Sequence, residues 1–176
     1  IKNISLLGSK GSGKTTLAEA MLYECGVIKR RGTVEAGNTV CDYFPVEKEY
    51  GYSVFSTVLY AEFLNKKLNV IDCPGADDFV GNAITALNVT DTGVILIDGQ
   101  YGVEVGTQNI FRTTEKLNKP VIFAVNQLDG EKADFDNVIG QMKEIFGPRV
   151  VQIQFPVNCG AGFNSMVDVL LMKLYT

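Results

Sequence analysis

The sequence contains no histidine, so no imidazole can act as a general acid or base anywhere in the chain. Its four cysteines, Cys25, Cys41, Cys73 and Cys159, form no C-x-x-C pair and have no metal-ligand spacing. They are typical of reduced thiols, which predicts a cytoplasmic location. No signal peptide is present, and no apolar stretch approaches the roughly 18 residues of a membrane span, so no membrane partner is expected.

Positive charge is also scarce. The net charge is −4 and the isoelectric point is about 4.9, so no global basic field attracts nucleic acid, and direct DNA binding is not expected. The only tight basic cluster is Lys29-Arg30-Arg31; a solvated loop is favoured there over a local nucleic-acid patch. The 176 residues, 46% of them hydrophobic, predict one domain with a core. The start at Ile1 rather than at Met indicates trimming.

A glycine-rich segment follows the apolar run Ile4–Leu7 and reads Gly-Ser-Lys-Gly-Ser-Gly-Lys-Thr. It matches the phosphate-binding pattern G-x-x-x-x-G-K-[ST] between a strand and a helix. Lys14 is expected to reach the β- and γ-phosphates, and the Thr15 hydroxyl to ligate Mg²⁺. A glycine-rich turn without a ligand is the alternative, which the order strand, loop, helix disfavours. The predicted phosphate contacts are Gly8, Ser9, Lys10, Gly11, Ser12, Gly13, Lys14, Thr15 and Thr16.

Strand and helix patterns alternate along the chain. This alternation predicts a doubly wound α/β fold, with a six-stranded, mostly parallel sheet, one antiparallel strand and helices on both faces. Residues 27–52 show weak periodicity, which is typical of a functional or mobile loop. Strands are predicted at 3–7, 54–64, 67–73, 93–98, 121–126 and 150–155, and helices at 14–25, 79–87, 107–117 and 135–146.

Two further motifs fall at predicted strand ends, where ligands bind in such sheets. Asp72-Cys73-Pro74-Gly75 matches the D-x-x-G of nucleotide hydrolases: Asp72 can hold a water on Mg²⁺, and the Gly75 amide can touch a γ-phosphate. Asn126-Gln127-Leu128-Asp129 is close to the guanine-reading N-K-x-D, in which the carboxylate accepts two guanine donors. Plain turns are the alternatives at both places. Gln127 replaces a lysine that braces the phosphate loop, which puts nucleotide affinity in doubt.

Together these motifs resemble translation elongation factor G. The resemblance covers essentially the whole chain and goes beyond general GTPase motifs. It implies a P-loop GTPase core over residues 1–155, and the beginning of an inserted, truncated subdomain over residues 156–176. The stretches that carry it are Ala18–Asp42, Asp72–Phe79, Tyr101–Gln108 and Phe163–Thr176.

Several positions depart from that family's pattern. The catalytic histidine aligns with Ala76, and the neighbouring Asp77 is interpreted as a solvated residue rather than a replacement base. Ser53 stands where the family has a threonine on Mg²⁺ and the γ-phosphate. Two apolar residues that flank the attacking water align with Lys10 and Tyr52. The family's final guanine motif, S-A-[KL], is absent, and Asn158-Cys159-Gly160 is not expected to replace it.

The resemblance implies a GTP-binding domain that uses GTP/GDP and Mg²⁺ and acts, in the intact protein, on the ribosome in translocation or recycling. A monomer is expected. Hydrolysis is expected to be slow, with Lys14, Ser53 and Gly75 as catalytic groups and Thr15, Ser53 and Asp72 at the metal. The alternative is a GTP-gated ribosome-binding module with little hydrolysis; an ATP-using protein is disfavoured by Asp129. Cys73, Pro74, Ala76 and Leu128 complete the predicted nucleotide contacts.

Overall fold

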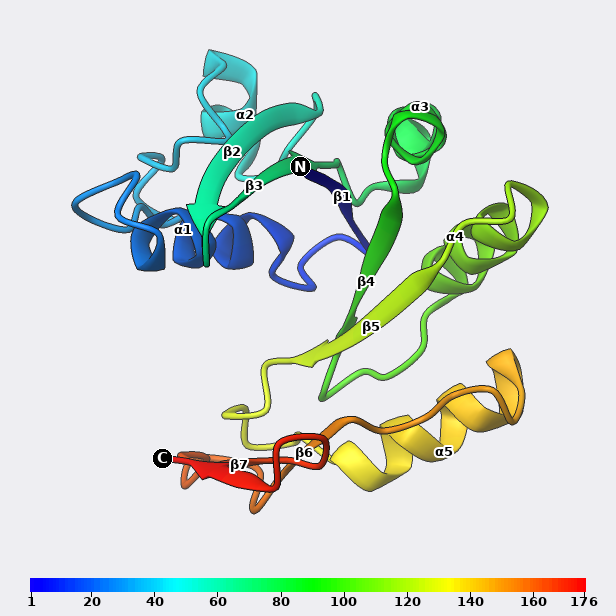
Figure 1. The fold of residues 1–176 in the computed structure, drawn as a ribbon. Coiled ribbons are helices and arrows are strands. Elements are labelled where there is room, and N and C mark those ends of the chain that lie inside the picture. Colours follow the sequence, from blue (N-terminus) through cyan, green and yellow to red (C-terminus); the bar gives the residue numbers. More distant parts are fainter.

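The computed structural model describes all 176 residues, and its centre is a five-stranded sheet in the order β2-β3-β1-β4-β5 (Figure 1). Neighbouring strands among β3, β1, β4 and β5 run parallel, whereas β2 pairs antiparallel with β3. The expected doubly wound arrangement with one antiparallel strand is therefore confirmed. The strands are β1 (Lys2–Leu7), β2 (Thr57–Phe63), β3 (Lys66–Asp72), β4 (Thr92–Asp98) and β5 (Val121–Asn126).

Helices cover both faces of this sheet, as expected. Helix α1 (Lys14–Glu24) packs on one face, where Ala18 and Leu22 join Leu6 and Leu96 in a buried cluster. The other face carries a larger cluster contributed by three helices. Strands buried on two faces explain the continuous apolar runs of β1 and β4. The three helices are α3 (Val80–Val89), α4 (Val105–Lys116) and α5 (Phe135–Phe146).

The predicted sixth strand at residues 150–155 is wrong. The backbone there pairs elsewhere: β6 (Gln154–Pro156) joins β7 (Met166–Asp168) and β8 (Lys173–Tyr175) in a separate antiparallel sheet. Val151 is 76% exposed, and a cavity of about 900 Å³ opens between this segment and β5. The edge of β5 is thus left unpaired. The division of the chain near residue 155 stays a prediction.

The weakly periodic segment contains a helix that its pattern did not predict. Helix α2 (Pro45–Tyr50) is short and begins with a proline, which suits the first position of a helix. It ends at Gly51, whose φ of 67° lies in the left-handed region that favours glycine. Before α2, Thr39, Cys41 and Asp42 are buried. The segment is therefore packed on the domain through part of its length, rather than being an open loop.

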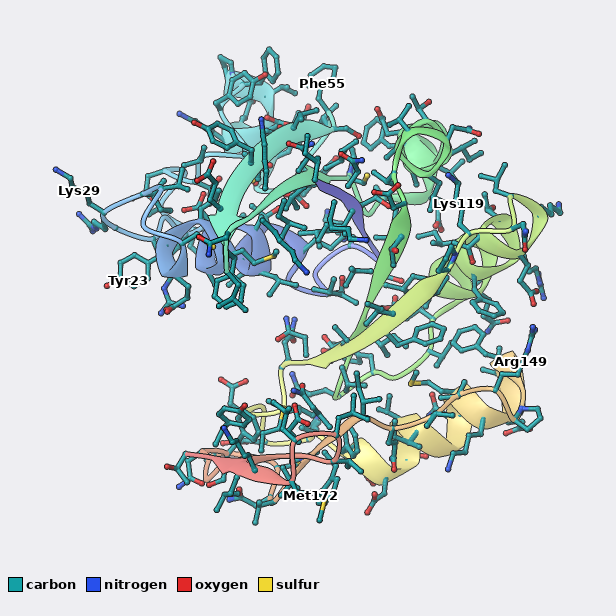
Figure 2. The ribbon with its side chains drawn as sticks, viewed as in Figure 1. Tyr23, Lys29, Phe55, Lys119, Arg149 and Met172 are labelled. Carbon is teal, nitrogen blue, oxygen red and sulfur yellow. The ribbon has the colours of Figure 1, made fainter.

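None of the helices is both long enough and apolar enough to traverse a lipid bilayer. The basic cluster Lys29-Arg30-Arg31 lies in an exposed loop, as expected. Lys29, Arg30 and Arg31 are all exposed, and Figure 2 shows the Lys29 side chain pointing outward from the tip of the loop after α1.

Candidate functional site

The motif residues gather at the carboxyl edge of the large sheet. β1 runs directly into the glycine-rich loop, β3 ends at Asp72 and β5 ends at Asn126. In the parallel register Asp72 lies opposite Leu6, and Asn126 lies opposite Asp98 at the end of β4. Three segments that are far apart in the sequence therefore meet at one edge, as the strand-end argument predicted.

The glycine-rich loop has the backbone conformation of a phosphate cradle. Gly8, Gly11 and Gly13 have φ values of 135°, 83° and 91°, which side-chain-bearing residues rarely adopt. A Cβ on Gly8 would collide with the Leu96 carbonyl, and one on Gly13 with the Asn126 side chain. Helix α1 begins directly after Gly13, so its positive end faces the loop.

Lys14 is buried within this loop. Its Nζ donates to the carbonyl oxygens of Gly8 at 3.0 Å and of Ser9 at 2.7 Å. Burial lowers the pKa of Lys14, while the charge of Asp72 opposes that shift. A Cβ on Gly75 would press against the same Nζ. Lys14 Nζ and the Gly75 backbone are thus close neighbours at the place predicted for a terminal phosphate, which would have to separate them.

The three predicted metal-site residues lie together. Thr15 Oγ1 donates to Asp72 Oδ2 at 2.8 Å and lies 3.2 Å from Ser53 Oγ. Asp72 is almost fully buried, and burial raises its pKa to about 6 although the Thr15 hydrogen bond and the Lys14 charge act in the opposite direction. Asp72 Oδ1 has no hydrogen-bond partner.

Asp42 was missed by the sequence interpretation. It is 4% exposed, neither of its carboxylate oxygens has a hydrogen-bond partner, and burial raises its pKa. Orphaned carboxylate oxygens beside hydroxyls are the donor set of a hard divalent cation, so the residues present fit Mg²⁺. An acidic residue in a loop of weak periodicity carries no signal by itself, because its burial depends on the fold.

The guanine-type motif is hydrogen-bonded to the glycine-rich loop. Asn126 Nδ2 donates to the Ser12 carbonyl at 2.9 Å, and Gln127 Nε2 donates to the Gly11 carbonyl at 2.6 Å. The brace expected of a lysine is therefore supplied by glutamine. Gln127 has a φ of 57°, and the Asp129 side chain is exposed, which leaves its carboxylate free for a ligand.

The segment after Gly75 offers no catalytic base in the cradle. Ala76 presents only a methyl group. Asp77 is exposed and lies against the first turn of α4: a Cβ on Gly106 would be 2.9 Å from Asp77 Oδ1. A carboxylate at a helix N-terminus is electrostatically favourable, which accounts for its position without a catalytic role.

Two buried glutamates hold the long segment between α1 and β2, and Glu47 holds the part of it next to Ser53. Glu47 is 1% exposed, and its carboxylate accepts hydrogen bonds from the amides of Phe44 at 3.2 Å, Val54 at 3.0 Å and Phe55 at 3.1 Å. Glu19, on α1, accepts the amides of Gly32 and Val40. Neither glutamate belongs to a recognised motif, so only the structure reveals them.

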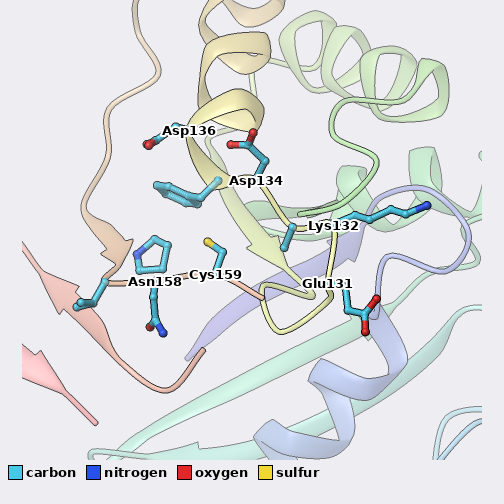
Figure 3. A pocket seen from close by; sticks show the side chains of 10 residues that line it. Glu131, Lys132, Asp134, Asp136, Asn158 and Cys159 are labelled. Carbon is cyan, nitrogen blue, oxygen red and sulfur yellow. The ribbon is translucent and has the colours of Figure 1, made fainter. Parts of the chain in front are cut away.

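A second cavity, of about 470 Å³, lies beside the guanine-type motif (Figure 3). Its walls are the loop Glu131–Asp136 and the strand end at Pro156–Cys159. The Gly160 amide donates to the Leu128 carbonyl at 2.8 Å, which ties Asn158-Cys159-Gly160 to that motif. These residues are therefore next to the predicted base pocket. That they do not replace the family's final guanine motif stays a prediction.

Comparison with known proteins gives matches across this whole chain. Residues 1–175 match the family described as elongation factor Tu GTP binding domain. The chain is 34% identical over 175 residues to an elongation factor G-like protein of Thermotoga maritima, and 36% identical over 174 residues to elongation factor G of Ureaplasma parvum. Both matches include 99% of this chain, but only 25% of the length of each relative.

Two further similarities agree with these. Ribosome-releasing factor 2, mitochondrial, of Candida dubliniensis is 34% identical over 178 residues, and the chain covers 22% of it. A solved crystal structure of a Thermus thermophilus protein superposes with a TM-score of 0.94 at 34% identity, over 99% of this chain and 26% of that one. The chain thus spans about a quarter of the length of each relative.

Proposed function

Since the chain belongs to the elongation factor Tu GTP binding domain family, with elongation factor G among its relatives, we propose that it binds guanine nucleotide with Mg²⁺ and hydrolyses GTP slowly. In the intact protein this activity would serve the ribosome in translocation or recycling, in the cytoplasm. Residues 156–176 would begin a further subdomain.

The observation that carries the nucleotide proposal is the pair of hydrogen bonds from Asn126 and Gln127 to the glycine-rich loop. They join a base-reading motif and a phosphate-binding loop into one continuous cradle. Asp129 then offers two acceptor oxygens to the N–H groups of guanine, and adenine lacks that donor pair. The preference for guanine over adenine therefore rests on Asp129.

The phosphate chemistry would come from groups already described. Lys14 and the Gly75 amide would stabilise negative charge as it develops on the γ-phosphoryl oxygens. Thr15, Ser53 and Asp72 would hold Mg²⁺, which supplies charge neutralisation on the phosphates when bound. Ser53 would join only in the GTP state.

Calorimetry with GDP and ADP tests the nucleotide assignment. A clear preference for GDP is expected, with weak binding by this chain alone, on the order of micromolar or −8 kcal/mol. Equal affinities for GDP and ADP would refute the guanine assignment.

A second function, a GTP-gated binding module with little hydrolysis, is favoured by one observation. Ala76 stands at the water-orienting position, and the chain has no histidine to take over. Single-turnover phosphate release by the full-length protein, with and without ribosomes, separates the two. Release that ribosomes accelerate supports the GTPase, whereas its absence under both conditions supports the binding module.

A further inference from the structure

Lys10 makes an unusual contact at the mouth of the glycine-rich loop. Its Nζ lies over the ring of Tyr52, 3.6 Å from the ring centroid. Lys10 is exposed, and Tyr52 directly precedes Ser53 of the predicted metal site. The contact therefore connects the phosphate loop with the segment that carries Ser53.

The backbone of Lys10 lies at the phosphate end of the cradle. A Cβ built on Gly75 would be 2.8 Å from the Lys10 amide nitrogen, and the same atom would press against Lys14 Nζ. Lys10, Lys14 and Gly75 thus converge on one point. Gly11, the next residue, has no atom within 4 Å of a Cβ built on it, so the loop is open beside Lys10.

The Lys10 ammonium has no carboxylate partner. Arg149 and Glu115 form the one ion pair within 4.0 Å in the structure, and they lie elsewhere. Tyr52 is half-buried and Lys10 is exposed, so this cation–π contact is only partly shielded from water, whereas a charge-assisted hydrogen bond to a phosphate oxygen is stronger. A terminal phosphate would therefore compete with the Tyr52 ring for this ammonium.

On the basis of the proposed function, we propose that Lys10 is a catalytic residue of GTP hydrolysis: its ammonium leaves the Tyr52 ring and binds the γ-phosphoryl oxygens. A water oxygen forms the new bond to the γ-phosphorus, and the bond from that phosphorus to the β–γ bridging oxygen breaks. The water proton goes to the released inorganic phosphate, GDP leaves, and Lys10 stays protonated. The Lys10 cation offsets the negative charge that develops on the γ-phosphoryl oxygens, which the methyl group of Ala76 cannot do.

The test uses the full-length protein with Lys10→Met, which keeps the chain length and removes the charge, and Lys10→Arg, which keeps the charge. Lys67→Met is the matched control, because Lys67 Nζ lies 5.0 Å from the Tyr60 ring centroid in the β2–β3 hairpin, outside the site. Affinities for GDP and for GDP with aluminium fluoride, single-turnover hydrolysis and thermal unfolding are measured.

The Lys10 amide nitrogen faces the cradle, whereas its Nζ lies over Tyr52, so the phosphate contact predicted for Lys10 with GDP is assigned to its backbone. Lys10→Met is therefore expected to leave GDP affinity and thermal unfolding unchanged, while weakening GDP–aluminium fluoride binding and slowing hydrolysis, each at least about tenfold. A positioned cationic finger is worth roughly 10³–10⁵ in the best cases, and a flexible lysine less. Lys10→Arg should retain most of both, and Lys67→Met should match the wild type.

The outcomes separate this inference from the function on which it rests. A wild type that binds no guanine nucleotide overturns both. A wild type that binds GDP, with Lys10→Met equal to it in aluminium fluoride affinity, overturns the role of Lys10 alone. That affinity decides the question even where hydrolysis is undetectable. Loss of GDP affinity in Lys10→Met would also overturn the inference, because it would show ground-state binding rather than catalysis.

Discussion

Gln127 Nε2 donates a hydrogen bond to the carbonyl oxygen of Gly11, 2.6 Å away, across 116 residues of sequence. A single amide thereby connects the end of β5 with the glycine-rich loop. The family's lysine at this position was expected to brace the loop with a charged head, and the shorter neutral side chain reaches the same loop. The substitution therefore preserves a brace, although without the charge.

Gln127→Ala should weaken GDP binding by roughly 1 kcal/mol, which is about fivefold, because it removes one hydrogen bond that holds the loop. Gln127→Lys should bind GDP at least as tightly as the wild type. Calorimetry on the three proteins measures the effect, with Gln152→Ala, outside the motif, as the control. Unchanged affinity in Gln127→Ala would show that the brace does not matter.

Thr15→Ala should remove the Mg²⁺ dependence of GTP binding. The Thr15 hydroxyl lies between Asp72 and Ser53, so its loss takes away a predicted ligand of the cation. GTP affinity is measured with Mg²⁺ and with a chelator. Thr85→Ala, at an exposed position on α3 outside the site, is the matched control. If Thr15→Ala keeps the Mg²⁺ dependence, the ligand assignment is wrong.

Ala76→His should raise GTP hydrolysis. A positioned water-orienting or acid–base group is worth about 10²–10⁴-fold, or roughly 3–5 kcal/mol of barrier. Rescue should be partial, because Tyr52 also alters the surroundings of the water. Single-turnover phosphate release on ribosomes compares the variant with the wild type. Fast phosphate release by the wild type, with no gain from histidine, would show that another group orients the water, and Asp77 would be tested next.

Glu47→Ala should lower the free energy of unfolding by about 3 kcal/mol, because three backbone amides lose a charged acceptor in a buried place. Glu49→Ala, on the exposed side of the same helix, should change it by no more than about 0.5 kcal/mol. Urea titration of both variants gives the comparison. Equal effects would mean that Glu47 does not hold the segment.

Strand ends and motif positions could be predicted from the sequence because local patterns determine them. The start of α1 at Lys14 and the end of β5 at Asn126 agree with the sequence-based boundaries. β2 begins at Thr57 rather than at the predicted Val54, since the Val54 and Phe55 amides are bound by Glu47 instead of by a neighbouring strand. The Glu47 carboxylate thus takes the amides that a neighbouring strand would have bound, and strand propensities do not include such a side-chain acceptor.

The sixth strand fails for a related reason. Residues 150–155 have the β-branched and aromatic composition of a strand, but composition does not choose the partner. Here Gln154 pairs with Asp168, and the Val169 amide donates to the Ile153 carbonyl, so the hydrogen-bonding groups are used by β7 and its neighbourhood rather than by β5. Helix α2 was missed because six residues are too few to show a helical period.

Glu19 has a mechanical consequence. It lies one helical turn after Thr15 on α1, and its carboxylate closes the chain from Gly32 to Val40 into a ring whose two ends meet on a single side chain. The ring is therefore anchored to α1, and a displacement of α1 is expected to carry the segment from Gly32 to Val40 with it.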